Sequence, residues 1–286
     1  MHTLYIVGTP IGNLEDLTPR AARVLAEVAL VAAEDTRVTR RLLNHLGVHA
    51  RVTSFHKHNW WNKLDRVLEQ LAEGDVALVS DAGMPGISDP GSELVTAATR
   101  AGFMVEVVPG PSAVTAALAL SGFPGDAFLF LGFLPRRKKE RQVALRQVAA
   151  LAMQVVVFEA PHRLRVTLAD VDAVFGDRPL AVCRELTKFH EEVFRGTAAQ
   201  ALEYFESPRG EMVLVVQSSA PQDDASLHSA GAEDQADVDT DLRVRLASLR
   251  HEGVRAKDAV ALVSETTGLA KNRVYRVWVE LGRETI

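Results

Sequence analysis

Ser80–Gly91 reads Ser-Asp-Ala-Gly-Met-Pro-Gly-Ile-Ser-Asp-Pro-Gly, and this stretch decides how the chain is organised. It follows the apolar run Val76–Val79, which predicts a buried strand, and it precedes residues 93–102, which predict a helix. Its three glycines let the backbone approach a ligand closely, and its two prolines fix the shape of the loop. A connector that only turns the chain needs about two to six residues. We therefore expect a ligand-binding loop at the carboxyl edge of a sheet, with a long turn without a ligand as the alternative.

Strand and helix patterns alternate on both sides of this loop. Apolar runs predict further strands at Leu4–Val7, Leu30–Ala33, Val52–Phe55 and Val105–Val108. The first helix is expected to open at Pro19, with Thr18 as its N-cap. The alternation predicts an α/β fold with a mostly parallel sheet covered by helices on both faces. The loops at residues 8–14, 34–37, 80–91 and 109–113 should then gather at one carboxyl edge.

The second half of the chain predicts a different sheet. Strands are expected at residues 128–131, 155–158, 180–184, 191–195 and 211–217. The last of them follow one another without a long helical pattern, so we expect a mixed or antiparallel sheet. A boundary near Gly122–Asp126 divides the two halves into an N-terminal domain, residues 1–122, and a second domain, residues 123–218.

The remainder of the chain differs in charge from these two domains. Residues 221–241 hold seven acids and no Lys or Arg, so we expect a flexible acidic linker at residues 219–241. Residues 242–286 carry nine Lys or Arg against five acids. Their apolar period at Leu242, Leu246 and Leu249 predicts a small module of three helices.

Composition indicates the class of protein and the cellular compartment to expect. The net charge of −5 gives no global basic signature of nucleic-acid binding. The lone Cys183 lies in an apolar run, which predicts a buried, inert thiol, and its being alone fits a reducing compartment. The chain begins on a strand pattern rather than a leader, and no apolar run approaches the roughly 20 residues that span a bilayer. We expect a cytoplasmic protein without membrane contact.

Several common sites lack their motifs. No Gly-x-Gly-x-x-Gly follows the first strand, and no Gly-x-x-x-x-Gly-Lys-Ser/Thr occurs anywhere in the chain. No set of His, Cys and acids has zinc-ligand spacing, so no metal is expected. What remains is a group of loops rich in glycine and proline, which offer backbone N–H and C=O groups to a ligand.

Eight segments, in order, resemble the ribosomal RNA small subunit methyltransferase I family of the tetrapyrrole-methylase-like superfamily. They are LYIVGTPIGNLEDLTPR (4–20), EDTR (34–37), SDAGMPGISDPG (80–91), PGPSA (109–113), GFLPR (132–136), FEAPHR (158–163), RELTK (184–188) and GEMVLVV (210–216). Together they cover about residues 4–217 and are highly specific. The tail from Leu242 is similar to the small C-terminal helical module of the family.

The resemblance implies a fold, a cofactor and a reaction. The fold is two α/β domains of the tetrapyrrole methylase type with S-adenosylmethionine (SAM) bound between them. The reaction is methylation of the ribose 2′-hydroxyl of a cytidine in the decoding region of 16S rRNA, on the small ribosomal subunit, by a homodimer. Carried over by motif, the implied cofactor-binding residues are Pro10, Asp81, Ala82, Gly83, Met84, Ile87, Ser112, Ala113, Glu159, Ala160, Pro161, Leu186 and Gly210. Met84 stands where the family more often has threonine, so it can act only through its backbone or by packing.

Removing the proton of a ribose hydroxyl calls for a base. Glu34, Asp35 and Glu159 are the candidate catalytic carboxylates, with Glu185 also near the expected cleft. A helix-cap or ion-pair role is the alternative for each, and Asp35 in particular could cap the helix that follows it.

Two basic features could contact RNA. Arg37 and Lys188 could hold the substrate beside the cleft, and Arg136, Arg137, Lys138 and Lys139, followed by Arg141, form the sharpest basic run. A solvated helix start is the alternative for that run. His56, His58, Trp60 and Trp61 could stack on an unpaired nucleotide, with core packing as the alternative for at least one tryptophan.

Two other functions compete with this interpretation. A methyltransferase of the same fold could act on a tetrapyrrole precursor, but it would need neither the basic run nor the basic tail. A non-catalytic RNA-binding assembly factor would need no cleft of several converging loops.

Overall fold

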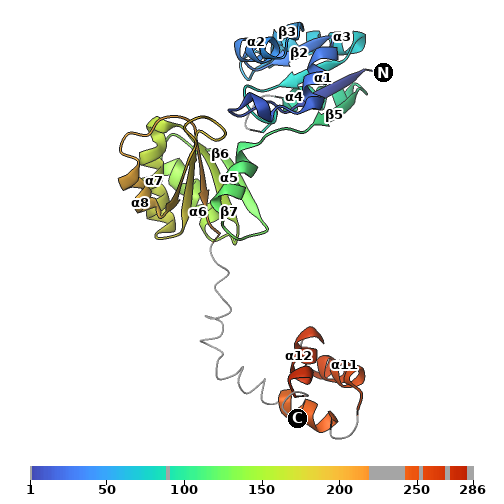
Figure 1. Cartoon of the computed structure of the whole chain (residues 1–286), viewed down its shortest axis with the longest axis vertical. Helices are drawn as coiled ribbons and strands as arrows, with labels where there is room; N and C mark the ends of the chain where they lie inside the picture. Colours follow the sequence, from blue (N-terminus) through green and yellow to red (C-terminus); the bar gives the residue numbers. More distant parts are fainter. Residues whose placement is uncertain (1, 88–90, 219–241, 251–253, 268–270, 282–286) are drawn as a thin grey trace. The chain divides into compact units, whose positions relative to one another are not determined.

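The computed structural model describes residues 2–87, 91–218, 242–250, 254–267 and 271–281. The predicted acidic linker at 219–241 lies outside these residues. The chain divides into two compact units, Met1–Ser219 and Ala220–Ile286. The first unit contains two five-stranded sheets, each with its own helices, which we call the first lobe and the second lobe (Figure 1).

The sheet of the first lobe is parallel throughout, as predicted. Its strands are β1 (Thr3–Val7), β2 (Leu30–Ala33), β3 (Val52–Ser54), β4 (Val76–Val79) and β5 (Met104–Val108). They lie in the order β3-β2-β4-β1-β5, and each pairing is parallel. This order places β4 between β2 and β1, so the loop after β4 lies between the loops that follow its two neighbours.

Helices cover both faces of this sheet. They are α1 (Pro19–Glu27) and α2 (Thr36–His45) on one face, and α3 (Trp60–Glu73) and α4 (Ser92–Arg100) on the other, with a short 3-10 helix η1 (Leu14–Asp16) before α1. Strand side chains alternate in direction, so Val31 packs with α1 and α2 whereas Leu30 packs with α3 and α4. The Ala21 N–H donates to Thr18 Oγ1 at 3.1 Å, which confirms the predicted cap.

The sheet of the second lobe is mixed, as predicted. Its strands are β6 (Phe128–Phe133), β7 (Gln154–Glu159), β8 (Leu180–Arg184), β9 (Glu192–Gly196) and β10 (Met212–Val216), in the order β6-β7-β10-β8-β9. Only the β6–β7 pairing is parallel among these described strands. The start of β10 therefore lies beside the ends of β7 and β8.

The last three strands follow one another with only the short helix α8 (Ala198–Tyr204) between β9 and β10. Helix α7 (Pro161–Phe175), between β7 and β8, was not predicted. Helix α7 buries Thr167 and Asp170 together with its apolar residues, so its buried stripe does not appear as an apolar period in the sequence. Both helices pack with α6 (Lys138–Ala149) on one face of the second sheet.

Helix α5 (Ala113–Ser121) covers the opposite face of the second sheet, against β8, β9 and β10 (Figure 1). The predicted division at residue 122 assigns this helix to the N-terminal domain. By its contacts α5 belongs with the second sheet, and the loop at 109–112 joins the lobes. The boundaries 1–122 and 123–218 remain predictions of chain organisation.

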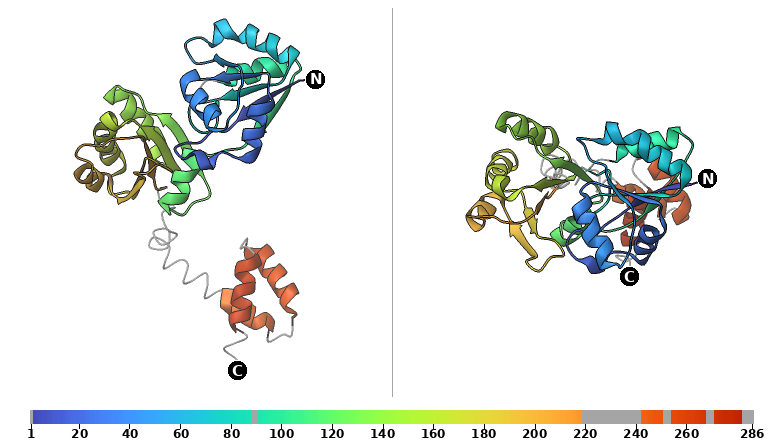
Figure 2. Two further views of the ribbon diagram at one scale, coloured as in Figure 1. Left: turned by 45° about the horizontal axis from the view of Figure 1, so that its top comes forward. Right: turned by 90° about the horizontal axis from the view of Figure 1, so that it is seen from above.

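The second unit is helical, as predicted. Residues 242–250 form a helix, followed by α11 (Ala256–Thr267) and α12 (Lys271–Leu281) (Figure 2). Their apolar core includes Leu242, Leu246 and Trp278. No described helix in either unit is both long and apolar enough to cross a membrane.

Candidate active site

A cavity of about 390 Å³ lies between the two lobes of the first unit. The first lobe contributes the loops that follow β1, β2, β4 and β5. The second lobe contributes the ends of β6, β7 and β8 and the start of β10. The lining residues are Ile11, Glu34, Asp81, Ala82, Gly83, Met84, Ile87, Ser112, Ala113, Val114, Phe133, Phe158, Glu159, Ala160, Pro161, Cys183, Leu186, Glu211, Met212 and Val213. The expected gathering of the four loops is confirmed.

Most of the residues predicted to bind a cofactor line this cavity, and two of them do not. Pro10 and Gly210 are absent from its walls. Pro10 follows Thr9, whose N–H donates to the Gly83 carbonyl at 2.9 Å. Gly210 has a φ of +82°, and a Cβ there would lie 2.5 Å from Glu185 Cγ. Pro10 is thus next to the backbone bridge between two loops of the first lobe, and Gly210 lies against Glu185.

The loops of the first lobe are held together by backbone contacts. The Gly83 N–H returns a hydrogen bond to the Thr9 carbonyl at 3.0 Å, and Thr9 Oγ1 donates to the Ser80 carbonyl at 3.2 Å. A Cβ on Gly110 would lie 2.8 Å from Gly8 Cα, so the loops after β1 and β5 touch only because both residues are glycine.

Two acidic side chains on the first-lobe wall are linked through backbone N–H groups. The Asp81 N–H donates to Glu34 Oε2 at 3.3 Å, and the Asp35 N–H donates to Asp81 Oδ1 at 2.9 Å. Burial is the main cause that raises the pKa of both Glu34 and Asp81 above the usual values. These carboxyls hold a proton more tightly than exposed acids do.

Asp35 lies outside the cavity lining and caps α2. Its Oδ1 accepts the Arg37 N–H at 2.8 Å, and its Oδ2 lies 2.6 Å from Arg37 Nη2. The hydrogen bonds from the Arg37 side chain, more than any other cause, lower the pKa of Asp35 to about 2. The capping alternative is therefore the role that the geometry supports for Asp35.

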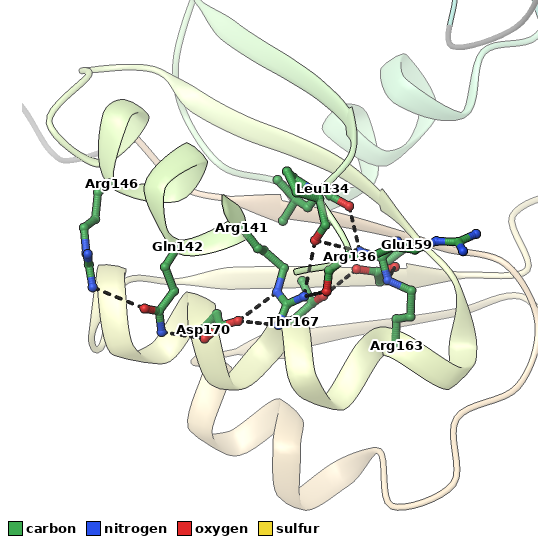
Figure 3. Close-up of polar contacts among 10 residues, drawn as sticks. Leu134, Arg136, Arg141, Gln142, Arg146, Glu159, Arg163, Thr167 and Asp170 are labelled. Atoms are coloured by element: carbon green, nitrogen blue, oxygen red, sulfur yellow. Dashed lines mark hydrogen bonds and ion pairs between the residues drawn. The ribbon is translucent and has the colours of Figure 1, made fainter. Parts of the chain in front are cut away.

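The Glu159 carboxylate is taken up by hydrogen bonds and an ion pair at the start of α7. It accepts the Ala160 N–H at 2.9 Å and the Thr167 hydroxyl, and it lies 3.3 Å from Arg163 Nε (Figure 3). Glu159 is buried, and this set of partners leaves it poorly placed to take a proton from a substrate. The ion-pair alternative is supported here too.

The basic run is split between surface and core. Arg136, Arg137, Lys138 and Lys139 are exposed at the start of α6, whereas Arg141 is only 4% exposed. Arg141 Nε donates to Asp170 Oδ2 at 2.7 Å, and Nη1 donates to the Arg136 carbonyl at 3.0 Å (Figure 3). The inclusion of Arg141 in a surface run was wrong, because a buried acid on α7 binds it.

A second arginine of this region, the partly buried Arg163, holds the same turn. Arg163 Nη2 donates to the Leu134 carbonyl at 2.7 Å while Nε faces Glu159. The turn at residues 134–136 is thus tied to the helix that begins at the cavity wall.

Lys188 forms ion pairs with two acidic residues. Its Nζ lies 3.0 Å from Glu185 Oε1 and 2.8 Å from Glu211 Oε2. Glu185 Oε1 also accepts the Glu211 N–H at 2.8 Å. Arg37 and Lys188 are therefore both ion-paired in this structure, unlike Lys138 and Lys139, for which the described residues include no ion-pair partner.

Several lining residues were missed from the sequence, namely Ile11, Val114, Phe133, Phe158, Cys183, Glu211, Met212 and Val213. Strand alternation offers a signal for some of them, because Phe158 shares a face of β7 with Val156, which packs against α5. The Phe133 and Phe158 ring centroids are 5.7 Å apart. Burial raises the pKa of Cys183 to about 11, which supports the predicted inert thiol.

Of the two tryptophans after β3, one packs in the core, as the alternative to nucleotide stacking predicted. Trp60 packs against the core of the first lobe, and Trp61 is 54% exposed. The described residues contain no group of three or more His, Cys, Asp and Glu side chains arranged to hold a metal ion.

Comparisons with known proteins agree with the motifs. The family model "Tetrapyrrole (Corrin/Porphyrin) Methylases" matches residues 3–202, and the model "RsmI C-terminal HTH domain" matches residues 232–282. Proteins named "Ribosomal RNA small subunit methyltransferase I" are similar to this chain. The one from Halalkalibacterium halodurans is 40% identical over 96% of this chain and 94% of its own length. The one from Escherichia coli O157:H7 is 41% identical over 97% of this chain and 94% of its own length.

Solved structures show the fold. A uroporphyrin-III-C-methyltransferase from Thermus thermophilus superposes with a TM-score of 0.54 at 22% identity, covering 76% of this chain and 94% of the other. The cobalt precorrin-4 methyltransferase CbiF superposes with a TM-score of 0.57 at 19% identity, covering 75% of this chain and 94% of the other. The predicted tetrapyrrole methylase type of fold is confirmed.

Proposed function

Because this chain belongs to the tetrapyrrole methylase family, and within it to the ribosomal RNA small subunit methyltransferase I family, we propose that it methylates the ribose 2′-hydroxyl of a cytidine in 16S rRNA. The methyl donor is SAM, and the target lies in the decoding region of the small ribosomal subunit. The observation that carries the proposal is the cavity that the family's own motif loops build from both lobes.

The residues of the cavity fit SAM. Backbone groups of the glycine-rich loop after β4 suit an adenosine recognised by shape and hydrogen bonds, and Phe133 and Phe158 of the second lobe offer aromatic surface in the same cavity. An aromatic face also favours a positively charged sulfonium. The candidate holding residues are those of the predicted cofactor set that line the cavity, from Asp81 on the first lobe to Leu186 on the second.

The bound cofactor would supply an activated methyl group, so the work of the protein is mainly alignment. Ser112, from the loop that joins the lobes, Ala113, at the start of α5, and Ala160 and Pro161, after β7, all line the cavity. Together they would hold donor and acceptor in line and exclude water. A carboxylate of the cavity would receive the proton of the hydroxyl.

The exposed basic residues at the start of α6 are the proposed RNA contacts. Arg136, Lys138 and Lys139 are solvent-exposed, and no ion pair within the described chain occupies them. Contacts of this kind to phosphates release counterions, so RNA affinity should fall as salt rises. Arg37 and Lys188 are weaker candidates, because each would have to exchange an acidic partner for RNA.

The tetrapyrrole alternative rests on fold alone, since the solved tetrapyrrole enzymes are 19–22% identical. The family resemblance further implies a homodimer that works in the cytoplasm. Sedimentation at working concentration would measure the oligomeric state.

The cofactor site is tested by calorimetric titration of SAM. Ala82→Phe, on the cavity wall, should weaken SAM binding by about tenfold or more, because a ring would fill space that the cofactor needs. Ala150→Phe, an exposed position at the end of α6, is the matched control and should leave the affinity unchanged. Equal affinity in all three proteins would contradict this placement of the cofactor.

A further inference from the structure

The acidic side chains around the cavity differ in how many hydrogen bonds and ion pairs they make with other residues of the protein. Glu159 is bound by Thr167, Arg163 and the Ala160 N–H. Glu211 pairs with Lys188 and points largely into solvent, with 76% of its side chain exposed. Outside the lining, Asp35 and Glu185 are bound to Arg37 and Lys188.

Glu34 is different. It follows β2, whose four residues are all buried, and it lies half-buried in the cavity wall. Its Oε2 accepts the Asp81 N–H at 3.3 Å, which orients the carboxylate. Its Oε1 accepts no hydrogen bond from any described residue. A carboxylate fixed by one oxygen and open at the other has the arrangement that a general base requires.

We propose that Glu34 is the general base of the transfer and that its Oε1 takes the proton of the acceptor hydroxyl. The inference rests on the function proposed above. In the step, the hydroxyl oxygen forms its bond to the methyl carbon as the carbon–sulfur bond breaks. The electron pair of that bond stays on sulfur, and the hydroxyl proton passes to Glu34, which later releases it to water.

The charges around Glu34 come from several elements. Burial, the largest cause, raises the pKa of Glu34. The hydrogen bond from the Asp81 N–H lowers it, the charge of Asp81 raises it, and Lys57 and His56, after β3, lower it, so that the pKa is raised on balance. Arg37 at the start of α2 acts on Asp81 rather than on Glu34.

Among the described residues, Asp81 and Glu211 are the other lining acids with an open oxygen, since only Oδ1 of Asp81 accepts a hydrogen bond, from the Asp35 N–H, and only Oε2 of Glu211 accepts one, from Lys188. Glu211 is set apart by that ion pair and by its exposure. The family resemblance assigns Asp81 to the cofactor. A general base and a cofactor-binding residue should respond differently when each carboxylate is replaced by the corresponding amide. Glu34→Gln should lower kcat and spare SAM affinity, and Asp81→Asn should weaken SAM binding.

The test measures methyl transfer to small ribosomal subunits and SAM affinity by calorimetry for wild type, Glu34→Gln, Glu34→Asp, Asp81→Asn and the exposed control Glu69→Gln. Glu34→Gln should lose about 10²–10⁴-fold in kcat with SAM affinity within about threefold of wild type. Glu34→Asp should recover part of that loss. Glu69→Gln, on α3, should match wild type in both measurements.

A readout without turnover comes from folding. Since burial raises the pKa of Glu34 in the folded state, the ionised carboxylate costs stability as pH rises through that pKa. Glu34→Gln has no such cost, so its free energy of unfolding relative to wild type should increase between pH 4 and pH 8. A difference that grows with pH supports a desolvated Glu34 carboxylate in the folded protein, and the kcat of Glu34→Gln decides whether that carboxylate is the base.

Activity measurements distinguish a failure of the Glu34 assignment from a failure of the proposed methyltransferase function. If wild type methylates the subunit and Glu34→Gln does so within about threefold, or if Asp81→Asn loses kcat with SAM affinity intact, then the assignment of Glu34 is wrong. If wild type methylates no RNA while SAM binds, the function proposed above fails instead.

Discussion

Replacing Arg141 by methionine should strongly destabilise the second lobe. The side chains of Arg141 and Asp170 are 5% and 3% exposed, and their closest N–O distance is 2.6 Å. Arg141→Met would leave the Asp170 carboxylate buried with Gln142 as its remaining side-chain partner, at 2.7 Å. It would also remove the donor to the Pro135 and Arg136 carbonyls.

The magnitude follows from burial. Breaking a buried ion pair by removing one partner costs about 3–5 kcal/mol, because the other charge stays buried without compensation. At about 2–4 °C per kcal/mol for a unit of this size, the melting temperature should fall by roughly 6–20 °C. The double variant Arg141→Met, Asp170→Leu removes both charges and should recover much of that loss.

The assay is urea and thermal unfolding of the three proteins with Arg137→Met as control. Arg137 pairs with Glu140 on the surface at 3.2 Å, with its side chain 85% exposed, so its loss should change stability by less than about 1 kcal/mol. A cost for Arg141→Met no larger than that of Arg137→Met would refute the reasoning. So would a double variant that is as unstable as Arg141→Met alone.

Three further predictions follow from contacts in the first unit. Gly110→Ala should cost about 1–3 kcal/mol in urea unfolding and weaken SAM binding, because its Cβ would press on Gly8 backbone. Gly47→Ala, at φ +66° with open space around it, should cost about 1 kcal/mol and leave SAM affinity unchanged; equal effects on SAM would contradict this. Cys183 should resist alkylation at pH 8 until the protein unfolds, since its pKa of about 11 leaves little thiolate. Changing Lys138 and Lys139 to Gln should reduce the salt slope of RNA binding by about one each, and an unchanged slope would exclude them as phosphate contacts.

The loops that build the cavity could be predicted because their chemistry is local. Glycine and proline at Ser80–Gly91, and short loops after buried strands, mark a carboxyl edge whatever the rest of the fold does. The order of strands could not be read from the chain. That order puts the loop after β4 between those after β2 and β1, and so brings Asp81 to Glu34 and Gly83 to Thr9.

Side-chain partners across the fold were beyond local patterns. Glu159 stands in a motif, but only the position of α7 shows that Thr167 and Arg163 hold its carboxylate. In the sequence Arg141 looks like a surface charge, and only the structure shows that Asp170 on α7 pairs with it. Helix α7 was not predicted for a related reason. Its buried side carries polar residues, whose hydrogen-bond and ion-pair partners are distant in the sequence.

Methyl transfer to ribosomal RNA is the most direct test of the whole account. Purified protein and isotope-labelled SAM would be given small subunits from cells that lack the enzyme, and the RNA would be digested to nucleosides for mass spectrometry. The account predicts labelled 2′-O-methylcytidine that depends on the protein. Label on a base, or no label on RNA while calorimetry shows that SAM binds, would contradict it.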